Sequence, residues 1–201
     1  MKYIPALDGI RALAILLVLL FHWFPIDHWV NILPNGPIGV TLFFVLSGYL
    51  ISNILMVQQT LGSFARSFKN FVARRALRIF PIYFLLLGLL WVLKRFAVVL
   101  NTDFYLHPGY YWSYLVNYWI EVNRNWADAL SPYWSLSVEE QFYLIWPIFL
   151  YFTPIKKFWI VPSLFIGLSL VFRIYNTNYN AIEYHTLSCI GDLSIGALIA
   201  W

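Results

Sequence analysis

The chain has 201 residues, of which 61% are hydrophobic and only 11% are charged, whereas globular domains are about half apolar and about a quarter charged. This composition excludes an ordinary soluble domain and indicates an integral membrane protein. The net charge of +4 is modest, and because no long basic run accompanies it, no nucleic-acid partner is expected. The single cysteine, Cys189, excludes an internal disulfide and a cysteine-based zinc site, and no metal is expected.

Long apolar runs recur along the chain, and a helix that spans a bilayer needs about 20 such residues. We therefore predict an all-α fold, a polytopic transmembrane bundle with about six spans. The spans are expected at 4–24, 38–57, 79–100, 134–152, 158–175 and 187–201. The shorter aromatic-rich run 110–122 fits an interfacial or re-entrant helix better than a full span. The last run ends at Trp201 without a polar tail, so the chain is expected to be the first part of a longer domain.

Basic residues are concentrated on alternate connections between these spans. Because basic residues mark cytoplasmic loops, the N-terminus is expected in the cytoplasm. The segments predicted on this side contain Lys2, Arg66, Lys69, Arg74, Arg75, Arg78, Lys156 and Lys157. The loops predicted on the opposite side contain Arg124 alone.

The first apolar run contains two ionisable residues, Arg11 and His22. At about 100° and 1.5 Å per residue, both leave one face of a helix roughly 16 Å apart. Such residues in membrane helices usually face a protein interior or an aqueous cavity, and they are functional candidates. For Arg11 the alternative is a structural ion pair with Asp8, three residues earlier. For His22 the alternatives are an interfacial position or a role as a base that takes a proton from a hydroxyl.

The second apolar run contains the small residues Gly36, Gly39, Ser47 and Gly48. Small residues let membrane helices approach one another closely, so packing is the expected role of the glycines. Ser47 lacks the G-x-S-x-G frame of a nucleophile, and we do not predict it to be one.

Three arginines precede the third apolar run. Arg75 and Arg78 are three residues apart, Arg74 and Arg78 are four apart, and side chains with these spacings share a helix face. Guanidinium groups on one face suit phosphate binding. Anchoring on anionic lipid is the alternative.

Two adjacent carboxylates, Glu139 and Glu140, lie at the start of the fourth apolar run. Ser137 and Glu140 have the spacing of a capping box, which predicts that Glu140 closes the start of a helix. Glu139 has no such structural explanation. Adjacent residues leave a helix about 100° apart, so at most one of the two is expected to face the same cavity as His22.

Taken in order, these stretches resemble the acyltransferase 3 family of bacterial membrane proteins, which includes O-acetyltransferases that modify surface polysaccharides. The resemblance rests on 7–12 with 21–22, on 39–51, on 75–83 and on 134–143. It implies transfer of an acyl group, typically acetyl from acetyl-CoA, to a hydroxyl of a cell-envelope carbohydrate at the inner membrane. It also implies that residues 1–201 are the N-terminal part of a membrane domain of about ten spans.

The resemblance implies functional roles for the ionisable residues described above. The catalytic candidates are His22, Arg11, Glu139 and Glu140, and the candidates for binding acyl-CoA are Arg75, Arg78 and Arg74. Transfer by direct attack and transfer through an acyl-histidine both remain open. One departure concerns a later Arg-x-Asp of the family, which appears here as Cys189-Ile-Gly-Asp192, without the arginine.

Two alternative functions use the same residues. Arginine, histidine and glutamate inside a membrane also mark solute or proton paths, so a transporter or flippase is the first alternative. The second is an inactive fragment of the acyltransferase domain, whose polar side chains would face lipid.

Overall fold

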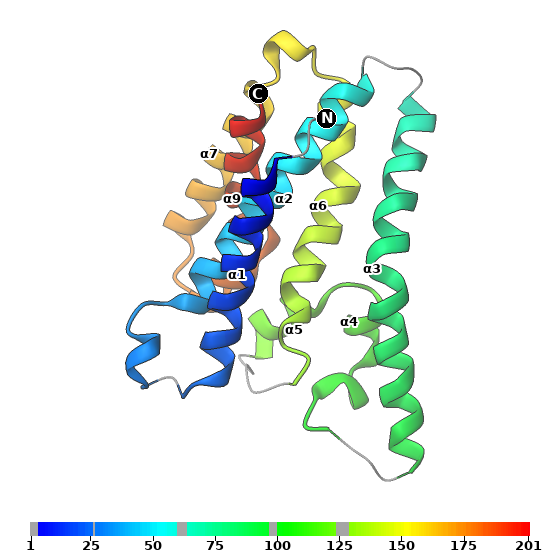
Figure 1. Cartoon of the computed structure of the whole chain (residues 1–201), viewed down its shortest axis with the longest axis vertical. Helices are drawn as coiled ribbons and strands as arrows, with labels where there is room; N and C mark the ends of the chain where they lie inside the picture. Colours follow the sequence, from blue (N-terminus) through cyan, green and yellow to red (C-terminus); the bar gives the residue numbers. More distant parts are fainter. Residues whose placement is uncertain (1–3, 26, 60–63, 97–99, 124–128) are drawn as a thin grey trace.

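A computed structural model of the chain describes residues 4–25, 27–59, 64–96, 100–123 and 129–201. Within these ranges every regular element is a helix (Figure 1). The long helices are α1 (Pro5–Trp23), α2 (Asn35–Gln59), α3 (Phe64–Arg95), α6 (Tyr133–Tyr151), α7 (Ile160–Tyr175) and α9 (Thr186–Ala200). The short helices are α4 (Pro108–Trp112), α5 (Val116–Asn123) and α8 (Tyr179–Tyr184), with 3-10 turns at Trp29–Asn31, Asp103–Tyr105 and Ile155–Lys157.

Within the described residues each of the six predicted spans lies largely in a helix, and four helical segments are long and apolar enough to cross a membrane. They are α1, α2, α3 and Ile155–Tyr175, which contains α7. Of the other two, α6 carries two glutamates, and the 15 residues of α9 extend about 22 Å. Both nevertheless run alongside the longer helices (Figure 1). The predicted all-α, multi-pass membrane bundle is confirmed.

The aromatic-rich run 110–122 does not form one continuous helix. It contains the end of α4 and most of α5, which are separated by a turn at 113–115. At this turn Tyr114 has a φ of 56°, in the left-handed region that non-glycine residues rarely adopt. Because α5 has only 8 residues and α4 only 5, neither helix is long enough to span a bilayer.

Helix α2 lies at the centre of the bundle and packs most extensively against α9 and α1. At the α2–α9 contact a Cβ added to Gly48 would overlap the Leu193 carbonyl, and a Cβ added to Gly196 would overlap the Val45 carbonyl. At the α1–α2 contact a Cβ on Gly36 would lie 2.6 Å from the Phe21 ring. The glycines therefore have the packing role that their sequence pattern predicts.

Two sequence expectations about helix starts are corrected by the structure. Helix α6 begins at Tyr133, so Ser137 lies inside the helix and its hydroxyl donates to the Tyr133 carbonyl at 3.0 Å. The predicted capping box of Ser137 and Glu140 is therefore wrong, because neither residue lies at the helix start. Helix α3 begins at Phe64, so the three arginines lie within it and not at its start.

Four of the basic residues predicted on the cytoplasmic side lie at one end of the bundle, whereas Lys94 and Arg95 lie in the last turn of α3. The start of α1, the end of α2, the start of α3 and the connection from α6 to α7 all lie at this end (Figure 1). Arg66, Lys69, Lys156 and Lys157 belong to it. Lys2 and Arg124, which also entered the charge argument, lie outside the described residues.

Candidate functional site

The candidate site begins with a hollow of about 310 Å³ between α1, α2, α3 and α6. We call it the arginine hollow because three guanidinium groups line it. Its charged and polar lining residues are Arg11, Arg75, Arg78, Ser47, Ser135, Glu139 and Tyr143. Residues from helices that are far apart in the sequence are thus brought together around one space.

Glu139 is the carboxylate of the arginine hollow, and two hydroxyl groups hold it. The Ser47 hydroxyl donates to its Oε1 at 2.7 Å, and the Tyr143 hydroxyl donates to its Oε2 at 2.7 Å. Both of its oxygens are therefore hydrogen-bonded, and the side chain is fixed in place. In this arrangement Ser47 serves as a hydrogen-bond donor that positions Glu139.

Of the three candidate arginines Arg74, Arg75 and Arg78, the last two line this hollow. The Arg75 guanidinium lies over the Tyr143 ring, 5.3 Å from its centroid, and Arg78 lines the hollow one turn later. Within the described residues neither arginine forms an ion pair, so both guanidinium groups can bind an anion. Arg74 is exposed and does not line the hollow.

Arg11 lines the arginine hollow from α1 and is also ion-paired with Asp8 at 3.3 Å. The ion pair that the spacing of the two residues allowed is therefore present. Arg11 lines the hollow although it is ion-paired, so the structural and the functional interpretation of this residue are compatible.

A second hollow of about 320 Å³ lies further along α1, near the C-terminal end of this helix. We call it the histidine hollow because His22, the second-last residue of α1, lines it. Its other polar and aromatic lining residues are Phe21, Trp134, Ser135, Tyr179, Glu183 and Tyr184. Val40 and Ser135 line both hollows, so the two adjoin each other.

The structure separates the two predicted glutamates from His22. Glu139 lines the arginine hollow, whereas Glu140 lines neither hollow and is 9% exposed. The Oε1 of Glu140 has no hydrogen-bond partner among the described residues. The carboxylate that shares the histidine hollow with His22 is Glu183 of α8, a residue that the sequence patterns did not single out.

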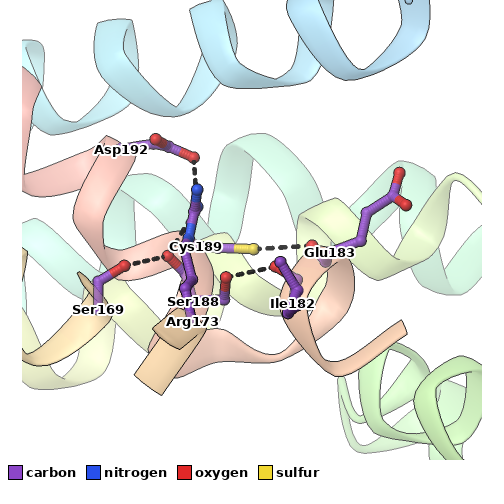
Figure 2. A network of polar contacts seen from close by, with 7 residues as sticks. All are labelled: Ser169, Arg173, Ile182, Glu183, Ser188, Cys189 and Asp192. Carbon is purple, nitrogen blue, oxygen red and sulfur yellow. Dashed lines mark hydrogen bonds and ion pairs between the residues drawn. The ribbon is translucent and has the colours of Figure 1, made fainter. Parts of the chain in front are cut away.

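A third hollow of about 400 Å³ continues beside α8 and α9 and is also lined by Val40. It contains an ion pair in which Arg173 of α7 contacts Asp192 of α9 at 3.3 Å (Figure 2). Arg173 also donates to the Ser188 carbonyl at 3.0 Å, and Ser169 donates to the same carbonyl at 2.6 Å. The acid Asp192, which lacks an arginine nearby in the sequence, thus obtains one from a neighbouring helix.

Among the described residues no group of three or more histidine, cysteine, aspartate or glutamate side chains could hold a metal ion. The chemistry available in the hollows is that of guanidinium groups, carboxylates, hydroxyl groups and one imidazole. Guanidinium groups bind anions, and a neutral imidazole can act as a base near pH 7.

Comparison with known proteins shows the family of the chain. The family model of the acyltransferase domain matches residues 4–190. The chain belongs to the acyltransferase 3 family. No solved structure matches the chain.

Curated relatives cover the chain to differing extents. The peptidoglycan O-acetyltransferase OatA of Listeria monocytogenes is 32% identical over 226 residues, which cover 100% of this chain and 34% of the relative. YrhL of Bacillus subtilis is 36% identical over 159 residues, covering 74% of this chain and 24% of its own. A Staphylococcus aureus protein is 30% identical over 223 residues, covering 100% of this chain and 35% of its own. The chain therefore spans about a third or less of the length of these relatives.

Proposed function

We propose that the full-length protein transfers an acetyl group from acetyl-CoA to a hydroxyl of a cell-envelope carbohydrate. Family membership favours acyl transfer over transport, and the name of the Listeria relative makes peptidoglycan the first acceptor to test. The observation that carries the proposal is the adjoining pair of hollows, with anion-binding groups in one and a base in the other.

The arginine hollow suits the donor. Acetyl-CoA is an anion with several phosphates, and Arg75 and Arg78 form no ion pair within the described residues. Arg11 lines the same hollow from the opposite helix, and Glu139 is held by Ser47 and Tyr143. In our proposal Arg75 and Arg78 bind the phosphates at the basic end of the bundle, and the thioester lies toward the histidine hollow.

His22 is proposed as the base. It removes the proton from the acceptor hydroxyl, the hydroxyl oxygen attacks the thioester carbonyl carbon, and the carbon–sulfur bond breaks. The proton passes to the departing thiolate, so an acetyl ester and free CoA result. Alternatively His22 attacks the thioester first and the acetyl group passes from the ring to the acceptor, a route that uses the same residues.

Orientation in the membrane follows from the charge distribution. Basic residues mark the cytoplasmic side, and Arg66, Lys69, Lys156 and Lys157 lie at the end where α1 starts. We therefore propose that the protein lies in the bacterial inner membrane with its N-terminus in the cytoplasm. The donor then enters from the cytoplasm, and His22 lies near the outer side.

The experiment that tests this function uses membranes that contain the full-length protein, radiolabelled acetyl-CoA and soluble glycan fragments of peptidoglycan. We expect alkali-labile label on the glycan and release of free CoA in equal amounts. Absence of transfer, together with passage of unmodified glycan across the membrane, would refute the proposal and support a transporter.

A matched pair of arginines tests the donor site. Arg78 and Arg74 are both exposed residues of α3, but only Arg78 lines the arginine hollow. A hydrogen bond to a charged group contributes about 1.5–3 kcal/mol, so Arg78→Ala should raise the KM for acetyl-CoA about tenfold to a hundredfold. Arg74→Ala should leave the KM within about twofold of the wild-type value.

Steady-state kinetics at varied acetyl-CoA concentration gives the result. Equal effects of the two substitutions would mean that the arginines act together through the membrane surface charge, and the donor site would then have to lie elsewhere.

A further inference from the structure

The carboxylate of Glu183 faces the histidine hollow, and neither the family motifs nor the proposed mechanism uses it. Glu183 is half-buried on α8, and it lines both the histidine hollow and the third hollow. Within the described residues it forms no ion pair. Its carboxylate forms hydrogen bonds with the Tyr179 and Tyr184 side chains. An ionised carboxylate has about four lone-pair sites, so it can accept further hydrogen bonds from a ligand.

Helix α8 is held in place by side chains that bind its last carbonyls. The Ser188 hydroxyl donates to the Ile182 carbonyl, and the Cys189 thiol donates to the Glu183 carbonyl at 3.2 Å (Figure 2). Asn117 of α5 donates to the Tyr184 carbonyl at 3.2 Å. The final carbonyls of a helix have no partner within the helix, and here three consecutive ones are bound by side chains from α5 and α9.

This anchoring fixes the backbone of Glu183, whose side chain instead forms hydrogen bonds with Tyr179 and Tyr184. Figure 2 shows the carboxylate extending away from Ser188, Cys189 and the Arg173–Asp192 pair. Asn117 also donates to the Thr186 hydroxyl at 3.1 Å, and Gln141 of α6 donates to the side-chain Oδ1 of Asn117 at 3.0 Å. The position of Glu183 is thus tied to α6, which carries the Trp134 side of the same hollow.

Aromatic side chains surround the Glu183 carboxylate. Tyr179 is 68% exposed, and Trp134 and Tyr184 are each 6% exposed, and all three line the histidine hollow. The neighbouring Glu183 carboxylate is the main reason that the pKa of Tyr179 is raised to about 12. Sites for small molecules typically combine such aromatic walls with a few polar groups that fix orientation.

We propose that Glu183 binds the acceptor carbohydrate, its carboxylate accepting hydrogen bonds from sugar hydroxyl groups while Trp134 and Tyr179 contact the sugar ring. An ionised carboxylate offers about four lone-pair sites, enough for two hydroxyl groups at once. Tyrosine and tryptophan present an apolar ring with a polar edge, which matches the two kinds of surface on a sugar. The inference rests on the proposed function for the identity of the ligand, and it places the acceptor in the hollow that His22 lines.

Binding of the acceptor to the purified full-length protein without any acyl donor tests the proposal independently of catalysis. The probe is a soluble glycan fragment of peptidoglycan, and the readout is the equilibrium dissociation constant. Loss of a hydrogen bond to a charged group weakens binding about tenfold or more, so Glu183→Gln should raise the Kd by at least that factor. Tyr179→Ala, at an exposed position where folding is not at risk, should also weaken binding several-fold.

Asp103→Asn is the matched control. It removes the same charge outside the three hollows, and its amide oxygen can still accept the hydrogen bond that the Trp119 ring nitrogen donates at 3.0 Å. The control should bind the glycan as the wild type does. The proposal is overturned if the wild type does not bind the fragment, or if Glu183→Gln binds it as tightly as the wild type.

The kinetic assay separates this proposal from the proposed function. If the wild type transfers acetyl and Glu183→Gln raises only the acceptor KM, both stand. If the wild type transfers acetyl and Glu183→Gln lowers kcat at an unchanged acceptor KM, Glu183 acts on His22 and not on the sugar, and this inference alone fails. If the wild type binds the glycan but transfers no acetyl, the proposed function alone fails.

Discussion

Replacing His22 with alanine should lower the kcat for acetyl transfer about 10²- to 10⁴-fold, the usual contribution of a general base. His22 is the histidine that lines the histidine hollow, and this hollow adjoins the one lined by Arg75 and Arg78. The imidazole is exposed on one side and packs edge-on against the Phe21 ring, with a centroid distance of 5.4 Å. Its removal should therefore affect chemistry much more than folding.

The same acetyl-transfer assay, at saturating concentrations of both substrates, measures the effect. His107→Ala is the matched control, because the His107 ring contacts the Trp119 ring at a centroid distance of 4.1 Å and His107 lines none of the three hollows described above. The control should keep its activity within about twofold. If His22→Ala retained more than about a tenth of the wild-type kcat, a chemical role for His22 would be refuted.

The fold could be predicted from the sequence because the hydrophobic pattern of a membrane helix is local. Apolar runs of about 20 residues define spans, and within the described residues each of the six predicted runs lies largely in a helix. The wrong prediction about the start of α6 also came from a local pattern. Ser137 and Glu140 match a capping box, but the aromatic residues Tyr133 and Trp134 extend the helix beyond it. A short spacing motif does not show where a helix begins.

Part of the candidate site could be predicted from the sequence, but the distribution of its residues between the hollows could not. The spacing of Arg11 and His22 predicts one shared face, and both residues line hollows. The sequence does not show which carboxylate lies near Arg11 and which lies near His22, because this depends on how α6 and α8 pack. The structure places Glu139 with Arg75 and places Glu183 with His22.

Interactions between segments that are far apart in the chain could not be predicted from any sequence pattern. Arg173 and Asp192 are on different helices and form an ion pair only because α7 packs against α9. Glu183 lies in a six-residue helix with no motif around it. A signal that was present is the unusual density of hydrogen-bonding residues in 182–192, where Ser188 and Cys189 each bind a carbonyl of α8.

Because α2 and α9 pack closely, the effect of a Gly→Ala substitution on stability should depend on the position of the glycine. Gly→Ala inside a helix normally stabilises by about 1 kcal/mol, and Gly88 and Gly167 have open space where a Cβ would be added. At Gly48 the new methyl group would overlap the Leu193 carbonyl. Because a backbone atom cannot move aside as a side chain can, Gly48→Ala should destabilise the protein by about 1–3 kcal/mol.

Thermal unfolding of the detergent-solubilised protein distinguishes the two classes. Gly88→Ala and Gly167→Ala should keep or raise the unfolding midpoint, and Gly48→Ala should lower it by several degrees. A midpoint for Gly48→Ala equal to that of Gly88→Ala would mean that α2 and α9 are further apart than the structure has them.

The double substitution at Gly48 and Gly196 tests whether the two contacts belong to one interface. Gly196 faces the Val45 carbonyl, one turn from Gly48 across the same helix pair. Once the first methyl group has moved α2 away from α9, the second one has more room. The loss of stability in the double variant should therefore be smaller than the sum of the two single losses, by about 0.5 kcal/mol or more, as is usual for coupled neighbours. Full additivity would show that each methyl group is accommodated by a local shift, and α2 and α9 would then not move as rigid rods.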